Sequence, residues 1–399
     1  MRQRVHSDTG AANPRRLPSG RALWLPVLWI ALLASCTPHI RRGPALEDFR
    51  IIPGLTALPR GDERYDCGPE ALSAVFTYYG KPISVQEISK RLFNRELRGT
   101  VVAKIPDFIR SCGYDAQIRS GSIAHLKAGV DERRPLVVMV KLKEGVLHFF
   151  VVVAYSDKHK TLAFLDYPQQ TGPQWAFLPY DLFSKYWLPA DNFMLEIIPA
   201  GSGLERAVRL DEAERWEEAQ AAYEEVLKEN PRSVAACVGL GYCRYFRGDA
   251  EGGIQATREA LKIVPDEPQA LNNLAHMLSD SEDSRAEALA VSDRAVEACR
   301  KAIRRLTEEA EEARDSAKAN LRALVDLRRE HLESSLGTRG GILHLFGRHE
   351  EAAQAYLEAG ELGLRPDTSA ARFRQAVQCF RQAGDEKRAA EIEGRLSGG

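Results

Sequence analysis

The chain lacks most features that mark metal, nucleotide and nucleic-acid proteins. Its formal net charge is −1 over 399 residues, which leaves no basic excess for binding nucleic acid. It has no His-Glu-x-x-His, no paired Cys-x-x-Cys and no Gly-rich phosphate loop. No apolar run reaches the roughly 18 residues that indicate a membrane-spanning helix. We therefore expect no cofactor, no metal site and no nucleic-acid partner.

Cysteine is sparse and shows no pairing pattern. The chain has seven cysteines, whose spacing matches neither a disulfide framework nor a set of metal ligands. Two of them, Cys36 and Cys67, stand in informative local contexts. An exported protein could oxidise some of the others, so their disulfide state stays open. These others are Cys112, Cys237, Cys243, Cys299 and Cys379.

Positive charge is concentrated at the N-terminus. Five arginines and one aspartate lie within residues 1–35, and a short apolar run extends from Trp24 to Ala34. Its length suits the core of a signal peptide better than a membrane span. The run ends in Leu-Ala-Ser-Cys36, which resembles the bacterial lipoprotein box, where the signal is cut before a cysteine that then takes up lipid. An uncleaved anchor or an ordinary signal peptide is the alternative.

The lipoprotein resemblance has consequences for location. It implies a signal peptide over residues 1–35, with Cys36 as the lipidated first residue of the mature chain. Thr37 follows the cysteine, and the lack of an aspartate there implies sorting to the outer membrane. We therefore expect a lipid-anchored protein of the bacterial cell envelope, on the periplasmic face of the outer membrane.

Composition divides the remaining chain into three parts. Residues 36–58 form a short N-terminal linker, residues 59–200 mix helix and strand patterns, and residues 204–396 have helical patterns throughout. A Gly-Ser-Gly sequence at 201–203 separates the last two parts as a flexible linker. In residues 59–200 helices come first and an antiparallel sheet follows. This order predicts an α+β domain, and an all-α domain follows it.

Local signals locate the elements of residues 59–200. Ser84 and Glu87 form a capping box, which predicts the start of a helix. Residues 101–112 carry apolar side chains at helical spacing, and Gly113 ends that pattern. Short apolar runs predict strands at 136–140, 148–155 and 161–165, and an edge strand at 193–198.

Cys67 is the strongest candidate for a nucleophile. It precedes Pro69, which suits the first turn of a helix, and Leu72 and Val75 follow at helical spacing. We predict that a helix begins at Cys67. The helix macrodipole favours negative charge there, which predicts a lowered thiol pKa and a nucleophilic thiolate. The alternative is that Cys67 is a small buried apolar residue.

His148 and Asp166 supply the other groups that a nucleophilic thiol needs. His148 begins one apolar strand, and Asp166 ends the next apolar run. On adjacent antiparallel strands their side chains could lie side by side. We therefore predict a catalytic set in which Cys67 is the nucleophile, His148 the base and Asp166 the group that orients the imidazole. Taken singly, His148 could be a strand-edge histidine and Asp166 a turn residue.

These segments resemble one known family. Asp-Cys67-Gly-Pro-Glu, His148-Phe-Phe and Asp166-Tyr-Pro are similar to the motifs of the bacteriocin-processing peptidases, which are papain-like cysteine peptidases. The resemblance covers roughly residues 55–170. It implies a papain-like α+β fold, the Cys67-His148-Asp166 triad and a peptide or protein substrate. Members that belong to peptide exporters cut after double glycine, but this chain has no transporter region, so that specificity is not expected here.

The chain departs from the family at the oxyanion hole. The family has a glutamine shortly before the cysteine, whereas this chain has Gly61 and Asp62 there. The residues that could replace it are Arg60, Asp62 and Arg64, together with the backbone N–H of Cys67. A carboxylate would repel the developing oxyanion. The departure therefore predicts slow or absent hydrolysis unless an arginine or a backbone donor substitutes.

The helical half contains an internal repeat. Pro231 and Pro265 lie 34 residues apart, which is the tetratricopeptide period. Trp216 begins a segment with the pattern of a second repeat helix, and Gly347 precedes another. Residues 284–336 interrupt the period and predict long charged helices. A coiled coil is the alternative, but no heptad pattern supports it. We predict an all-α tetratricopeptide-repeat solenoid.

The predicted function combines these parts. It is a lipid-anchored, exported cysteine peptidase that acts on peptides or proteins, with helical repeats that recruit a substrate or protein partner. Membrane contact would come through the N-terminal lipid. The alternative is a non-hydrolytic, peptidase-like scaffold that holds peptides, and the repeats could instead only pack on the peptidase domain. Acyl transfer to a nucleophile other than water is also open to the same triad.

Overall fold

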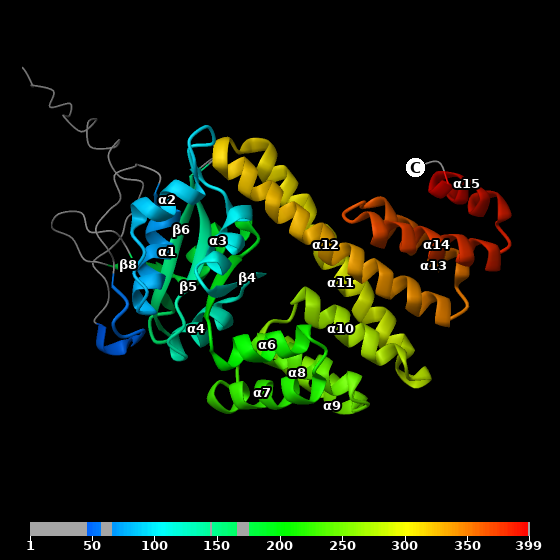
Figure 1. Cartoon of the computed structure of the whole chain (residues 1–399), viewed down its shortest axis with the longest axis horizontal. Coiled ribbons are helices and arrows are strands. Elements are labelled where there is room, and N and C mark those ends of the chain that lie inside the picture. The colour runs from blue at the N-terminus through cyan, green and yellow to red at the C-terminus, as the bar shows by residue number, and fades with distance from the viewer. Residues whose placement is uncertain (1–45, 57–65, 144–145, 166–174, 398–399) are drawn as a thin grey trace, which may run out of the picture. The chain divides into compact units, whose positions relative to one another are not determined.

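The computed structural model describes residues 46–56, 66–143, 146–165 and 175–397 (Figure 1). We call residues 46–199 the sheet region and residues 203–397 the helical region. The predicted signal peptide with Cys36 lies outside the described residues. So do Arg60, Asp62, Arg64 and Asp166. None of the described helices is both long and apolar enough to span a membrane.

The sheet region is built on a seven-stranded antiparallel sheet. Its strands follow the order β4-β9-β5-β6-β7-β8, and β1 pairs separately with β6. The strands are β1 (Arg50–Ile51), β4 (Tyr114–Ser120), β5 (Leu136–Lys143), β6 (Val146–Ser156), β7 (Thr161–Leu165), β8 (Trp175–Pro179) and β9 (Phe193–Pro199). A small hairpin forms from β2 (Phe93–Asn94) and β3 (Gly99–Thr100). The predicted α+β order, with antiparallel strands after the first helices, is confirmed.

Short helices surround this sheet. They are α1 (Cys67–Tyr78), α2 (Val85–Leu92), α3 (Ile105–Ser111), α4 (Ile123–Asp131) and α5 (Tyr180–Trp187), with 3-10 turns η1 (Leu46–Asp48), η2 (Val102–Lys104) and η3 (Leu188–Ala190). The helix start predicted at Ser84 is confirmed, because the Ser84 hydroxyl accepts a hydrogen bond from the Glu87 N–H at the start of α2. Gly113 ends the α3 segment with φ +82°, a conformation that favours glycine.

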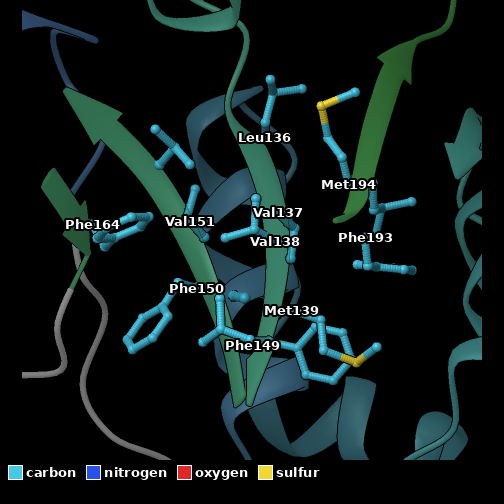
Figure 2. Close-up of a cluster of buried hydrophobic side chains, with 14 of the residues drawn as sticks. Leu136, Val137, Val138, Met139, Phe149, Phe150, Val151, Phe164, Phe193 and Met194 are labelled. Carbon is cyan, nitrogen blue, oxygen red and sulfur yellow. The ribbon is translucent and has the colours of Figure 1, made fainter. Parts of the chain in front are cut away.

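The two central strands are buried on both faces. Val138 of β5 pairs with Phe150 of β6, and Met139 pairs with Phe149. All four side chains are buried, and Figure 2 shows them among apolar residues of β7 and β9. Burial on both faces explains why these strands are continuous apolar runs rather than alternating ones.

One strand prediction was wrong in its place. The strand at 193–198 exists as β9, but it lies inside the sheet between β4 and β5 instead of at the edge. Its neighbour β4 (Tyr114–Ser120) was not predicted, because Asp115, Gln117 and Arg119 interrupt any apolar run there. Because β4 was not predicted, β9 was expected to have one neighbouring strand instead of two and was therefore placed at the edge.

The helical region consists of antiparallel helices. They are α6 (Gly203–Glu212), α7 (Trp216–Glu229), α8 (Val234–Phe246), α9 (Ala250–Ile263), α10 (Pro268–Ser279), α11 (Arg285–Glu312), α12 (Asp315–Leu345), α13 (His349–Glu361), α14 (Pro366–Gln382) and α15 (Glu386–Ser397), with the 3-10 turn η4 (Glu282–Ser284) before α11. The predicted helix start at Trp216 is confirmed. The long helices predicted for residues 284–336 are α11 and α12.

The hairpin of α11 and α12 packs on the sheet region. Leu306, Leu321 and Leu324 belong to the same buried apolar cluster as the strands of the sheet. At the turn before β9, both carboxylate oxygens of Asp191 accept hydrogen bonds, one from Arg305 and one from Arg328. The hairpin therefore contributes directly to the core of the sheet region.

Candidate active site

Cys67 is the first residue of α1, as predicted. The helix is anchored at this end by a hydrogen bond of 2.8 Å from the Glu70 N–H to the Asp66 carbonyl. The Asp66 carboxylate in turn accepts a hydrogen bond of 2.8 Å from the Ser89 hydroxyl of α2. Leu72 and the other apolar residues of α1 are buried, and α1 packs against β6. The start of α1 is thus held by both neighbouring elements.

The electrostatic prediction for Cys67 was wrong. Burial is the largest influence on its thiol and raises the pKa to about 11, although the residue keeps part of its surface exposed. The carboxylates of Glu70 and Asp66 raise the pKa further. Hydrogen bonds from the backbone N–H groups of Phe149 and Gly68 lower it, but by less than burial raises it. In this site desolvation outweighs the helix N-terminus.

His148 lies on β6, directly before Phe149, whose backbone N–H donates a hydrogen bond to the Cys67 sulfur. It pairs with Val140 of β5, and the centroid of its ring lies 4.5 Å from that of Phe150. The N–H of Phe149, the next residue, is one of the two backbone donors to the Cys67 sulfur. The fold therefore brings the sulfur against the backbone of β6 next to His148. The predicted partner Asp166 follows the end of β7, outside the described residues.

A contact that the sequence did not predict adjoins this site. Thr100 is buried, and a Cβ atom placed on Gly68 would lie 2.5 Å from its Oγ1 atom. Thr100 in turn contacts Asn320 of α12 through its carbonyl. No sequence signal points to this contact, because Thr100 and Asn320 are 220 residues apart.

A second candidate site lies in the helical region. A pocket of about 540 Å³ opens between α7, α8 and α9. Leu227, Leu240 and Ile263 supply apolar walls, and Arg244 and Glu259 supply charge. The mixture of apolar and charged groups suits a peptide or protein segment better than a small apolar molecule.

The comparison with known families bears on the cysteine region first. The model of the Peptidase C39 family matches residues 59–189. Residues 59–189 form a Peptidase C39 domain. The C39 domain contains Cys67 and His148, and a tetratricopeptide-repeat model matches the residues that follow it, 204–268. The predicted order of a cysteine peptidase domain and then repeats is confirmed.

The chain was also compared with curated proteins and with solved structures. No curated protein matches the chain. Among solved structures, MamA from Desulfovibrio magneticus RS-1 is 14% identical and aligns with 49% of this chain and 94% of its own, with a TM-score of 0.35. YrrB, described as a TPR protein with an unusual peptide-binding site, is 17% identical and aligns with 48% of this chain and 80% of its own, with a TM-score of 0.32.

Proposed function

We propose that this protein is an exported, lipid-anchored cysteine peptidase that cleaves peptides or proteins through Cys67, His148 and Asp166. The observation that carries the proposal is the position of the Cys67 sulfur, at the start of α1 and against the backbone of β6 beside His148, within a C39 domain. The match to tetratricopeptide repeats supports a protein or peptide partner for the helical region.

The chemistry follows from the groups assigned to the site. His148 removes the thiol proton of Cys67 as the sulfur attacks the substrate carbonyl, and Asp166 orients the imidazole. The backbone N–H of Cys67, with Arg60 or Arg64, is assigned to stabilise the oxyanion. The imidazolium then protonates the leaving amine, which gives a thioester on Cys67. Water deprotonated by His148 hydrolyses the thioester and releases the acid product.

The raised pKa of Cys67 makes the base essential. A thiol with a pKa of about 11 is protonated at neutral pH, so nucleophilic thiolate has to form by proton transfer within the site. His148 is the group proposed to accept that proton. A bound substrate excludes further water from the site. Proton transfer from Cys67 to His148 is then favoured only if a carboxylate pairs with the charged imidazolium, which is the function assigned to Asp166.

The decisive experiment compares four proteins on a proteome-derived peptide pool. We expect the wild type to cleave peptides. We expect cleavage to be abolished in Cys67→Ala and in His148→Ala, as measured by mass spectrometry of new peptide ends. Cys112→Ala is the matched control, because Cys112 is another partly exposed thiol of the same domain. Cleavage by Cys67→Ala at the wild-type rate would refute the proposal.

A lipid on Cys36 is the basis of the proposed location. Labelling with an alkyne fatty acid in a bacterial host is expected to mark the wild-type chain and to leave Cys36→Ala unlabelled. Equal labelling of the two chains, or none, would reject the lipid anchor. The peptidase assignment does not depend on this result.

The raised thiol pKa also favours a second function. A neutral, buried thiol is a poor nucleophile, so the C39 domain could hold peptides without cutting them. Peptides that bind both wild type and Cys67→Ala, with no new peptide ends in either case, would support this scaffold. The pocket between α7, α8 and α9 is the proposed surface for the protein partner.

A further inference from the structure

The first turns of α12 contact one backbone segment of the C39 domain at three points. The Ser316 N–H donates to the Leu97 carbonyl at 2.7 Å. The Asn320 side chain donates to the Thr100 carbonyl at 2.9 Å and accepts from the Val102 N–H at 2.8 Å. Residues 97–102 therefore have their shape set in part by a helix from the other half of the chain.

Asn320 is suited to this contact in a way that few side chains are. It is 2% exposed, and its amide offers one acceptor and two donors from a single short side chain. The two backbone groups that it contacts, the Thr100 carbonyl and the Val102 N–H, are buried, so water does not take the place of the Asn320 amide. Removing the amide would leave a buried N–H and a buried carbonyl without partners, and such groups relax toward solvent.

The same segment presses on the start of α1. Gly68 has no room for a side chain, because a Cβ there would lie 2.5 Å from Thr100 Oγ1 and 2.9 Å from Thr100 Cγ2. The Gly68 N–H is one of the donors to the Cys67 sulfur. A displacement of Thr100 therefore reaches the residue whose backbone holds the sulfur.

We propose that Asn320 is a positioning residue for Cys67: it fixes residues 100–102, which hold Gly68 and the start of α1 in place. The proposal builds on the proposed function, since it assigns the helical region a direct part in arranging the nucleophile. It also means that any partner that moves the α11–α12 hairpin alters the thiol site.

The attachment of the hairpin itself does not depend on Asn320 alone. Arg305 and Arg328 bind Asp191 at the turn before β9, and Leu306, Leu321 and Leu324 pack into the core. Arg305 binds Asp191, at a different place from the contact of Asn320 with residues 100–102, so Arg305→Met is a matched variant. It weakens attachment of the same hairpin at a different place.

The test measures alkylation of Cys67 by iodoacetamide in the full-length protein, by mass spectrometry, between pH 6 and pH 10. Asn320→Leu is expected to loosen the start of α1, to relieve burial of the thiol and to shift the labelling curve to lower pH. A shift of one pKa unit makes labelling at pH 8 about tenfold faster. Peptide cleavage is expected to slow through kcat, with little change in KM.

The controls separate positioning from general destabilisation. Arg305→Met is expected to lower the melting temperature while the Cys67 labelling curve stays at the wild-type position. Thr100→Ser removes only the methyl group that faces Gly68, and is expected to shift the curve in the same direction by less. This mild variant keeps the test valid if Asn320→Leu fails to fold.

Two results would overturn the proposal. One is a wild-type labelling curve in Thr100→Ser and in folded Asn320→Leu, and the other is an equal shift in Arg305→Met. Alkylation of Cys67 needs no hydrolysis of a peptide. A wild-type protein without peptidase activity would therefore refute the proposed function, and the labelling curves of the variants would still decide whether Asn320 positions Cys67.

Discussion

At the scale of single residues, Cys67 shows how burial opposes a favourable local position. The helix N-terminus and two backbone N–H groups favour the thiolate, whereas burial, Glu70 and Asp66 oppose it. The second group of effects is larger, because removing a small anion from water costs more than one helix end restores. Reactivity is therefore decided by what surrounds the sulfur after folding.

This balance predicts the pH dependence of Cys67 labelling. With a pKa of about 11, the thiolate fraction rises about tenfold per pH unit from pH 7 to pH 10, and the alkylation rate is expected to rise with it. His148→Ala is expected to leave this curve unchanged while it abolishes cleavage. Fast labelling that is flat from pH 6 upward would show a preformed thiolate–imidazolium pair instead.

The same shift affects stability with a definite sign. The folded-state pKa lies above that of an unfolded cysteine, so the neutral thiol contributes stability in full below the unfolded value near 8.5. That contribution is lost as the pH rises toward about 11. Chemical denaturation at pH 8 and pH 10 is expected to show a smaller loss of stability at the higher pH for Cys67→Ala than for wild type.

At the scale of elements, close helix contacts define the repeats. Gly239 of α8 is buried, and the ring of Tyr223 from α7 occupies the space that a Cβ atom would need. Gly394 of α15 has open space at the same position. Glycine is thus required for packing in one helix and unnecessary in the other.

The two glycines predict opposite effects of the same substitution. Gly239→Ala forces Tyr223 out of its place and is expected to cost about 1–3 kcal/mol of unfolding free energy. Gly394→Ala restores helix propensity at an exposed site and is expected to gain about 1 kcal/mol. Urea denaturation of both variants checks this, and an unchanged stability in Gly239→Ala would mean that Tyr223 does not need the space beside Gly239.

At the scale of the whole molecule, the buried charge cluster around Asp191 joins the two halves. Asp191 and Arg328 are buried, and Arg328 also contacts His331 at 3.4 Å. Burial and the charge of Arg328 lower the pKa of His331 to about 4, so this histidine is neutral at pH 7. The carboxylate of Asp191 is therefore the group that balances the arginines.

Removing that charge is expected to weaken the whole unit. Asp191→Asn keeps a residue that tolerates the observed φ of 55°, but leaves the buried Arg328 without its counter-charge, at a cost of about 3 kcal/mol. Glu361→Gln, which breaks the exposed pair with Arg395, is expected to cost less than about 1 kcal/mol. Both variants are measured by thermal and urea unfolding. Equal losses of stability in Asp191→Asn and Glu361→Gln would contradict a structural charge cluster.

Local patterns were sufficient for much of this protein. The helix start at Ser84, the helix that begins at Cys67 and the prolines 34 residues apart each depend on neighbours in the chain, and each appears in the structure or its family matches. Periodicity reports such features because a helix turn or a repeat is encoded within a few tens of residues.

Contacts between distant segments lay beyond those patterns. The inner position of β9 needed the polar strand β4, the high pKa of the Cys67 thiol needed the packed surroundings of α1, and the approach of Asn320 to Thr100 needed the fold of some 220 intervening residues. Spacing along a chain carries no measure of burial or of which surfaces meet. Those depend on how the entire polypeptide excludes water, and they settle how the thiol of this C39 domain behaves.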